Sequence, residues 1–411
     1  SLRFVFYSPE KSVVTQVREL SVSPSTDLSD LVLALPEGNY KLVVIANPTP
    51  KLVARTAVGS PLSQLTGYEH YYTDELATQG SQLTVSLLNE QGPVTVTSAA
   101  FSSTTPQVRI QLESVLARVL VYGEPRLAGG AKRGSAPAGY VLSPQARYTA
   151  PLRPLGLLRT GGSEVAGDGS HPEDRYPTSR MCQEWKDSAP KSLTELLSHF
   201  ALDRMTSHEG GEDIYQARLL PDEQALAAAV SNIHAYARET TLPPTAYLVG
   251  ALPSLVIRFP YIPGGLTLRE NEGWVSFRGK YYTESQVKEW IRSDDFDDST
   301  LAEAVKAARI NEDSFTPFEK GDLRFYYRGY NYYVVPIRHF DDTKAPTKAS
   351  IGRYGVVRGA EYRIRLTQIL RPGTPVPPDL TADLTPVAEE KNVHAIVSVR
   401  PIVVHSSEIH I

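Results

Sequence analysis

Alternation of apolar and polar residues is the strongest pattern in this chain, and it predicts β-strands. Leu2, Phe4 and Phe6 alternate with Arg3, Val5 and Tyr7 at the start, which is typical of a half-buried strand. Residues 40–45 form an apolar run that ends at a turn signal. Further along, Tyr362, Ile364 and Leu366 alternate with Arg363, Arg365 and Thr367. The pattern therefore predicts a mainly β protein.

Residues 108–121 carry two alternating runs that do not share one parity. Val108, Ile110 and Leu112 set the first, and the second, from Val115 onward, falls on the other parity. The change comes at Glu113 and Ser114. One extra residue in a strand shifts every following side chain to the opposite face, so we expect a bulge in one long strand.

Most predicted helices lie after residue 190, and residues 60–77 are ambiguous and could form a short helix. Ser192 with Glu195, Thr283 with Gln286, and Thr300 with Glu303 have the spacing of a capping box. An Ala-rich stretch that begins at Asp222 predicts a further helix to about Glu239.

A small, polar and turn-prone stretch suggests a domain boundary. Residues 126–139 are rich in Gly, Ala and Pro and contain Lys132 and Arg133. We therefore expect an N-terminal domain over 1–125, a linker over 126–139, and a C-terminal domain over 140–411 with helical insertions. Trypsin should cut near Lys132 and Arg133.

Composition narrows the possible functions. The 411 residues include 42 basic and 46 acidic ones, a net charge of −4, which gives no sign of nucleic-acid binding. No apolar run approaches 18 residues, so we expect no membrane-spanning segment in the mature form. The single cysteine, Cys182, excludes an intramolecular disulfide framework and a Cys-rich zinc site.

Candidate chemistry is weak throughout. None of the common phosphate-binding, zinc-protease or serine-hydrolase motifs occurs. A solvated surface loop is a better interpretation than a metal site for two groups of residues. The groups are His171, Glu173 and Asp174, and His208 with Glu209. Capping of the next helix explains Asp294, Asp295, Asp297 and Asp298 better than calcium binding. We expect ordinary packing for Cys182, and no catalytic residue, metal or cofactor.

A group of tyrosines allows two interpretations. The favoured interpretation is cross-strand packing, and the alternative is a platform on which a ligand stacks. The group consists of Tyr326, Tyr327, Tyr330, Tyr332 and Tyr333. The balance of these observations favours a structural or adhesive protein over an enzyme.

Several segments carry a resemblance to a known family. In the C-terminal half they are Arg278-Gly279-Lys280-Tyr281-Tyr282, Gly329-Tyr330-Asn331-Tyr332-Tyr333-Val334-Val335-Pro336-Ile337, Gly352-Arg353-Tyr354-Gly355-Val356-Val357-Arg358 and Pro372-Gly373-Thr374-Pro375. In the N-terminal half they are Gly38-Asn39-Tyr40-Lys41-Leu42-Val43-Val44-Ile45-Ala46-Asn47 and Leu116-Ala117-Arg118-Val119. Together they resemble the fimbrillins, the pilus subunits of type V fimbriae in Bacteroidetes-type bacteria, with the minor-fimbrium branch the closer match. The resemblance keeps its order over most of the chain but is poor over 160–240.

The resemblance implies two transthyretin-like β-sandwich domains in tandem, made as an outer-membrane lipoprotein precursor and displayed extracellularly in a cell-surface fimbrium. It also implies that an arginine-specific protease removes an N-terminal segment and thereby exposes a groove, which the C-terminal strand of the next subunit fills. Ser1 would then follow the cleavage site. Leu2, Phe4 and Phe6 would form the first strand of the acceptor groove.

The last residues of the chain suit such a donor strand. The odd positions that would face the groove are Val403, His405, Ser407, Ile409 and Ile411, of which His405 and Ser407 interrupt the apolar face. The alternative is that residues 402–411 complete their own domain.

Two roles remain open at this point. The first is a structural subunit that polymerises with other fimbrial subunits and supports adhesion and biofilm formation. The second is an accessory or tip fimbrillin that binds a host or bacterial ligand.

Overall fold

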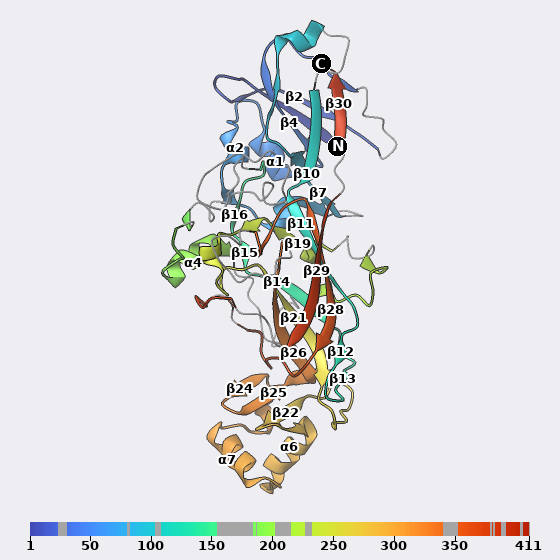
Figure 1. Cartoon of the computed structure of the whole chain (residues 1–411), viewed down its shortest axis with the longest axis vertical. Coiled ribbons are helices and arrows are strands. Elements are labelled where there is room, and N and C mark those ends of the chain that lie inside the picture. Colours follow the sequence, from blue (N-terminus) through green and yellow to red (C-terminus); the bar gives the residue numbers. More distant parts are fainter. Residues whose placement is uncertain are drawn as a thin grey trace.

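The computed structural model describes most of the chain: residues 1–23, 31–79, 83–102, 108–153, 184–185, 187–201, 215–226, 232–339, 352–378, 380, 383–387, 392–402 and 406–410. The molecule is elongated, with an N-terminal β-body at one end, a larger β-sandwich in the middle, and a small α/β module at the other end (Figure 1). The expected mainly β fold is confirmed.

The N-terminal body is built around one sheet of eight strands. Its order is β2-β1-β4-β8-β10-β30-β3, with β9 also paired to β4. The strands are β1 (Leu2–Tyr7), β2 (Val14–Leu20), β3 (Leu31–Val32), β4 (Tyr40–Ala46), β8 (Leu87–Asn89), β9 (Val94–Val96), β10 (Val108–Ser114) and β30 (Ser406–His410). Both faces of β1 are buried, because apolar clusters pack on each side of it.

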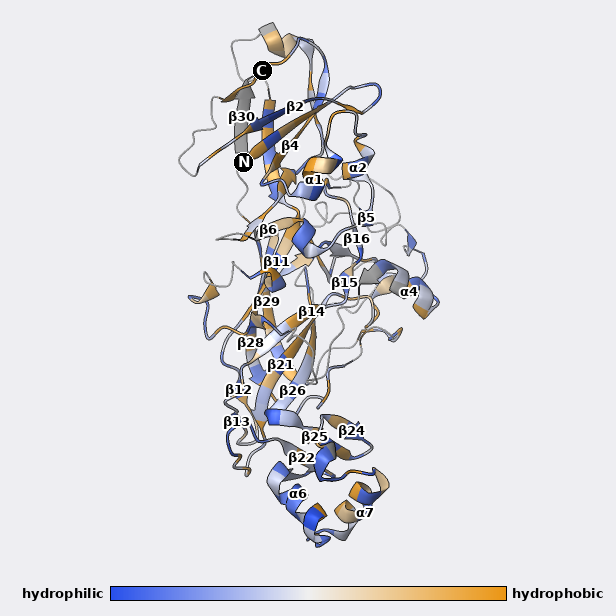
Figure 2. Ribbon diagram, turned by 180° about the vertical axis from the view of Figure 1, so that it is seen from behind, coloured by the Kyte–Doolittle hydropathy of each residue, from blue (hydrophilic) through white to orange (hydrophobic). Residues whose placement is uncertain are grey.

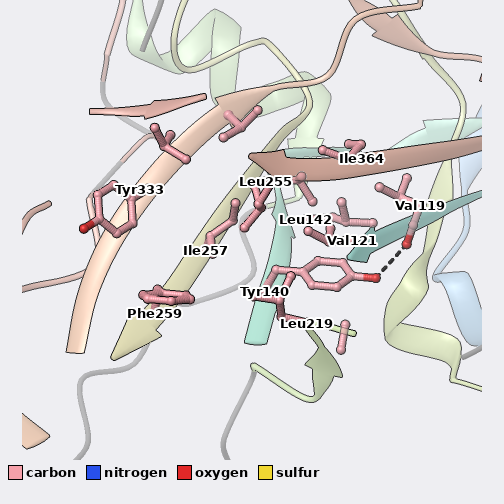
Figure 3. Close-up of a cluster of buried hydrophobic side chains, with 14 of the residues drawn as sticks. Val119, Val121, Tyr140, Leu142, Leu219, Leu255, Ile257, Phe259, Tyr333 and Ile364 are labelled. Carbon is pink, nitrogen blue, oxygen red and sulfur yellow. Dashed lines mark hydrogen bonds between the residues drawn. The ribbon is translucent and has the colours of Figure 1, made fainter. Parts of the chain in front are cut away.

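The middle body is a sandwich of two sheets. One contains β11 (Leu116–Tyr122), β12 (Arg126–Leu127), β19 (Tyr236–Arg238), β28 (Ala360–Ile369) and β29 (Val393–Pro401). The other contains β13 (Lys132–Arg133), β14 (Gly139–Ser143), β18 (Ala217–Arg218), β21 (Ser254–Ile262) and β26 (Tyr330–Pro336). Alternate side chains of both sheets meet in one core, as in other face-to-face sheet packings (Figure 3). The hydroxyl of Tyr140 donates to the Val119 carbonyl, 2.7 Å away, across that core.

The chain passes from the first sheet to the second within three residues. β10 ends at Ser114 and β11 begins at Leu116, so the parity change predicted as a bulge marks the crossing between bodies. Val115 is buried between the two.

The stretch predicted as a linker lies inside the middle body. Arg126 is paired with Gln368, and Lys132 with Ile262, so both short strands belong to the sandwich sheets. The sequence interpretation erred because small residues and glycines also suit tight turns between short paired strands. In the structure the second body starts at Leu116, ahead of the predicted boundary.

Residues 263–329 form the α/β module, inserted between β21 and β26. It consists of β22 (Trp274–Phe277), β23 (Lys280–Thr283), α6 (Glu284–Ser293), α7 (Ser299–Ala307), η6 (Glu312–Ser314), β24 (Phe318–Lys320), β25 (Leu323–Tyr326) and η7 (Tyr327–Gly329). The helices cover one face of the four-stranded sheet and share an apolar core with it. The exposed side of α6 carries mostly hydrophilic residues (Figure 2).

Two of the predicted helix starts are confirmed, one at α6 in this module and one at α4 beside the middle body. Thr283 and Gln286 form the capping box of α6. Ser192 Oγ accepts from the Glu195 N–H at the start of α4 (Leu193–His199). The third helix, α7, begins at Ser299 instead, with Asp298 as its cap.

The Ala-rich helix predicted to end near Glu239 is wrong in its last part. Tyr236–Arg238 is strand β19, paired with β11, because Ala237 packs into the sandwich core. Tertiary packing here overrides helix propensity.

The remaining described elements are short. The helices are α1 (Pro50–Arg55), α2 (Ser63–Thr66), η1 (Thr73–Glu75), η2 (Ser98–Ser102), η4 (Ile233–Ala235) and η5 (Pro244–Ala246). The strands are β5 (Glu69–His70), β6 (Ala77–Gln79), β7 (Leu83–Val85), β15 (Gln145–Ala146), β16 (Tyr148–Thr149), β17 (Phe200–Ala201), β20 (Thr240–Thr241) and β27 (Gly355–Val356).

Candidate functional site

The last described strand of the chain lies in the first sheet. β30 runs antiparallel to β10 and parallel to β3, and thus occupies the place between them. Figure 1 shows β30 beside β10 in the N-terminal body, far from the module at the other end. We call the place between β10 and β3 the slot.

The slot borders an apolar core. Val108, Ile110 and Leu112 of β10 are buried and belong to one cluster with Leu2, Phe4 and Phe6. The predicted groove residues therefore share the core that adjoins the slot. Their strand β1 does not flank it, because β1 pairs with β2 on one side and β4 on the other.

The register of β30 on β10 sets which residues share a face of the sheet. Ile409 lies opposite the buried Val108, and Ser407 opposite the buried Ile110. The placement of Ser407 and Ile409 on the apolar face of a donor strand stays a prediction. Of the other predicted donor residues, Val403, His405 and Ile411 lie outside the described residues.

The register partner of Glu408 is Arg109, whose side chain is exposed.

The route into the slot runs through a fixed point. β29 ends with Pro401 opposite Ala360, and the next N–H, of Ile402, donates to the Gly359 carbonyl at 2.7 Å. The N–H of Gly359 in turn donates to the Leu116 carbonyl at 3.3 Å. The C-terminal run therefore leaves the sandwich at the point where the chain crosses from β10 to β11. Residues 403–405 connect this point to β30.

A buried ion pair lies at the crossing. The guanidinium of Arg153 donates to both carboxylate oxygens of Glu113, with Nε at 2.8 Å from Oε1. Burial raises the pKa of the Glu113 carboxyl to about 7, although Arg153 and Arg358 lower it. Gly359 has a φ of 69°, a left-handed conformation that favours glycine, and a Cβ there would lie 3.5 Å from Glu113 Oε2.

A second buried pair joins the same region to the loop after β16. Arg358 contacts Glu239, with Nε at 3.2 Å from Oε2, and both side chains are almost wholly buried. The same guanidinium donates to the carbonyls of Pro151 at 2.8 Å and Ala150 at 2.7 Å. We call Glu113, Arg153, Glu239 and Arg358 the junction cluster.

The tyrosine group is structural. Tyr326, Tyr330, Tyr332 and Tyr333 are buried, and only Tyr327 is half-buried. Tyr326 stacks on Trp274 with ring centroids 3.7 Å apart. A platform for a ligand would need exposed ring faces, so this interpretation does not hold.

The acidic run before α7 caps the helix, as predicted. Asp298 accepts from the N–H groups of Thr300 at 3.0 Å and Leu301 at 3.2 Å, and from Lys280 Nζ at 2.8 Å. These hydrogen bonds hold the pKa of Asp298 well below its usual range. The described part of the chain contains no group of three or more His, Cys, Asp or Glu placed to hold a metal ion.

Other sequence candidates cannot be placed. Cys182, His171, Glu173, Asp174, His208 and Glu209 lie outside the described residues. Within the described ranges, no helix is both long enough and apolar enough to cross a membrane.

A comparison with protein families matches residues 324–408 to "Major fimbrial subunit protein type IV, Fimbrillin, C-terminal". Residues 324–408 are therefore similar to a fimbrillin C-terminal region. This region contains β26, β28 and β29 and reaches into β30. The resemblance to the fimbrillins is thereby confirmed. The assignment to the minor-fimbrium branch stays a prediction.

Several solved structures align with this chain at low identity. A fimbrilin from Porphyromonas gingivalis W83 aligns at 14% identity with a TM-score of 0.40, over 97% of this chain and 90% of that one. A candidate cell adhesion protein from Parabacteroides distasonis ATCC 8503 aligns at 12% identity with a TM-score of 0.40, over 98% and 93%. Another from Bacteroides eggerthii DSM 20697 aligns at 10% identity with a TM-score of 0.39, over 99% and 89%. A comparison with curated proteins gave no match.

Sequence reasoning missed the junction cluster and the role of β3. Glu113 and Glu239 were visible only as single acidic residues inside predicted strand or helix, and their arginine partners lie 40 and 119 positions away. Leu31, Leu33 and Leu35 alternate with Val32 and Ala34, a signal that could have marked β3 as a strand.

Proposed function

We propose that this chain is a structural subunit of a cell-surface fimbrium, polymerised when the C-terminal strand of one copy enters the slot of the next. The observation that carries the proposal is the position of β30. The end of the chain pairs with β10 and β3 of the first sheet, although its sequence neighbour β29 belongs to the sandwich.

The physical argument concerns what an empty slot would expose. Without β30, β10 would present unpaired N–H and C=O groups beside the apolar cluster of Val108 and Ile110. A strand from any copy of this chain would satisfy the same backbone groups by β-augmentation. When the strand of one copy enters the slot of the next, the contact joins two different surfaces of the same chain. A contact of this head-to-tail kind gives a filament when it does not close into a ring.

The connection after Ile402 suits exchange. β29 ends at Pro401 and β30 begins at Ser406, so only four sequence positions separate two strands that pair in different sheets. A short connection of this kind favours exchange of the segment between molecules. The described state, with β30 in its own slot, would then be the closed monomer.

The wider assignments follow from family resemblance. We propose an outer-membrane lipoprotein precursor, maturation by an arginine-specific protease, and a role in adhesion and biofilm formation. The alternative is an accessory or tip subunit, and the module inserted over 263–329 favours this alternative. β21 and β26 pair along seven registered positions, so a short turn could join these two strands in place of the module.

The test uses a chain truncated after Pro401 and a peptide with the sequence of residues 402–411. We expect the truncated chain to stay folded by circular dichroism, to fail to polymerise, and to bind the peptide. A peptide with Ile409→Lys is the matched control and should bind at least about tenfold more weakly, since a charge would be placed on the core face. Equal binding of both peptides, or polymerisation of the truncated chain, would contradict the proposal.

A further inference from the structure

Strand β3 depends on β30 for its place in the sheet. Among the described residues, β30 is the only strand that pairs with β3, with Leu31 opposite Ile409 and Val32 opposite His410. Every other strand of the first sheet has a partner that does not come from the C-terminal end. Removal of β30 would therefore leave the backbone of β3 without a ladder.

The segment after β3 is held by other contacts. Arg18 Nε donates to the Ala34 carbonyl at 3.2 Å, and the Tyr40 hydroxyl donates to the Pro36 carbonyl at 2.8 Å. Both contacts come from strands, β2 and β4, that pair with β1 and not with β30. Residues 34–36 are thus anchored whether or not the slot is filled.

The side chains of the segment give it an inner and an outer face. Leu33 is buried in the cluster that contains Val108 and Ile110, and Leu31 packs against that cluster. Val32, between them, is 72% exposed. The apolar contacts bring β3 to the outer side of the slot, and the backbone of β30 then fixes its register.

From these contacts we infer that residues 31–33 form a latch: an arm, anchored at 34–36, that closes over a strand of the sequence Ser406–His410 once it lies against β10. The latch lengthens the stay of that strand, because the strand is then paired along both edges instead of one. The inference deepens the proposed function and rests on it only where the strand comes from a second copy.

In this arrangement the slot has a fixed and a movable wall. β8 pairs with Leu112 to Ser114 of β10, directly after the stretch Val108 to Gln111 that pairs with β30, and the side chains of Val108 and Ile110 are buried in the apolar cluster. The strand would therefore dock first on β10, where four register pairs form, and β3 would close afterwards with two. Specificity for the incoming strand then comes from both walls.

Hydrogen–deuterium exchange on the monomeric full chain tests the latch without any need for polymerisation. In a chain that lacks residues 406–411, amides at 31–33 should exchange at least about tenfold faster, while those of β4 at 42–45 stay protected. Peptide 402–411 should restore protection. Unchanged protection at 31–33 in the truncated chain would overturn the inference.

A matched pair of substitutions tests the direction of the coupling. Leu33→Ala removes the buried apolar contact of the latch and should speed amide exchange at 406–410 by about tenfold. Val32→Ala changes an exposed position and should leave that exchange rate unchanged. Faster exchange throughout the sheet, β4 included, would show that β3 is an integral part of the fold and would also overturn the latch. Failure of copies to exchange strands, with the latch effects intact, would count against the proposed function alone.

Discussion

Substitution of Arg358 should separate the energetic role of the junction cluster from that of ordinary surface charges. Arg358→Met keeps the length of the side chain but removes five described polar contacts, two with Glu239 and one each with Thr149, Ala150 and Pro151. Glu239 stays buried, at 5% exposure, and loses its cation. The variant therefore leaves a buried carboxylate and two carbonyls without this donor.

The expected loss follows from the cost of an unpaired buried charge. Removal of one partner of a buried ion pair typically costs about 3–5 kcal/mol. The two carbonyls also lose their donor, and because the effects of groups in one network do not add, we expect a loss in the upper part of that range. A loss of this size at the crossing would loosen the N-terminal body from the sandwich and disturb the point from which the C-terminal run leaves.

Equilibrium unfolding in urea, followed by tryptophan fluorescence, measures the loss. Arg278→Met is the matched control, because its ion pair with Asp322 is exposed on both sides and should be worth about 0–1 kcal/mol. The double variant Arg358→Met with Glu239→Gln should lose less stability than Arg358→Met alone, since no unpaired charge remains. A loss below about 1 kcal/mol for Arg358→Met, or one equal to the control, would refute this reasoning.

Three further predictions concern other parts of the molecule. Trp274→Ala should destabilise the chain by about 3–5 kcal/mol, because its ring stacks on Tyr326 where the module meets the sandwich; a loss under about 1 kcal/mol in urea would contradict this. Burial lowers the pKa of His339 from 6.5 to about 4, so the neutral ring contributes stability above pH 6.5 that is lost as the pH falls towards 4. His339→Gln should remove that slope from the pH dependence of the unfolding free energy, and an unchanged slope would contradict it. Lys132 and Arg133, whose backbones pair with β21, should resist limited trypsinolysis, and early cleavage there would restore the linker interpretation.

The alternation pattern predicted most of the long strands because one face of each is buried and the other is not. It worked for β28, where Tyr362 and Ile364 enter the core and Arg363 stays partly exposed. It also marked Glu113 and Ser114, but a change of parity has the same signature whether the strand bulges or passes to another sheet. Only the pairing of β11 with β28 distinguishes the two.

The domain boundary could not be predicted from local composition. Gly129 and Gly130 have positive φ angles in a tight connection between β12 and β13. Local sequence does not distinguish a glycine in such a turn from a glycine in a linker between domains. Likewise, the alternation of 403–411 indicated a strand with one apolar face but carried no information on which sheet would receive it. That depends on contacts between residues about 300 positions apart, as in the pair of Val108 with Ile409.

The most direct measurement of strand exchange is a disulfide between two different chains. One chain carries Arg109→Cys and the other Glu408→Cys, both with Cys182→Ala. The two positions are opposed in register, and the Cα separation of about 4.5–5.5 Å in such pairs suits a disulfide. Thr95→Cys replaces Arg109→Cys in the control, because Thr95 is exposed on β9, which pairs with β4.

The mixture is assembled, oxidised and separated by size under denaturing conditions. If β30 is given to a neighbouring copy, Arg109→Cys and Glu408→Cys chains will be covalently joined in the assembled fraction, and the Thr95→Cys control will stay unlinked. If the strand remains in its own slot, a chain that carries both cysteines will close within itself, and the mixture of single variants will show no more linked chains than the control. That second result would contradict polymerisation by exchange of the C-terminal strand.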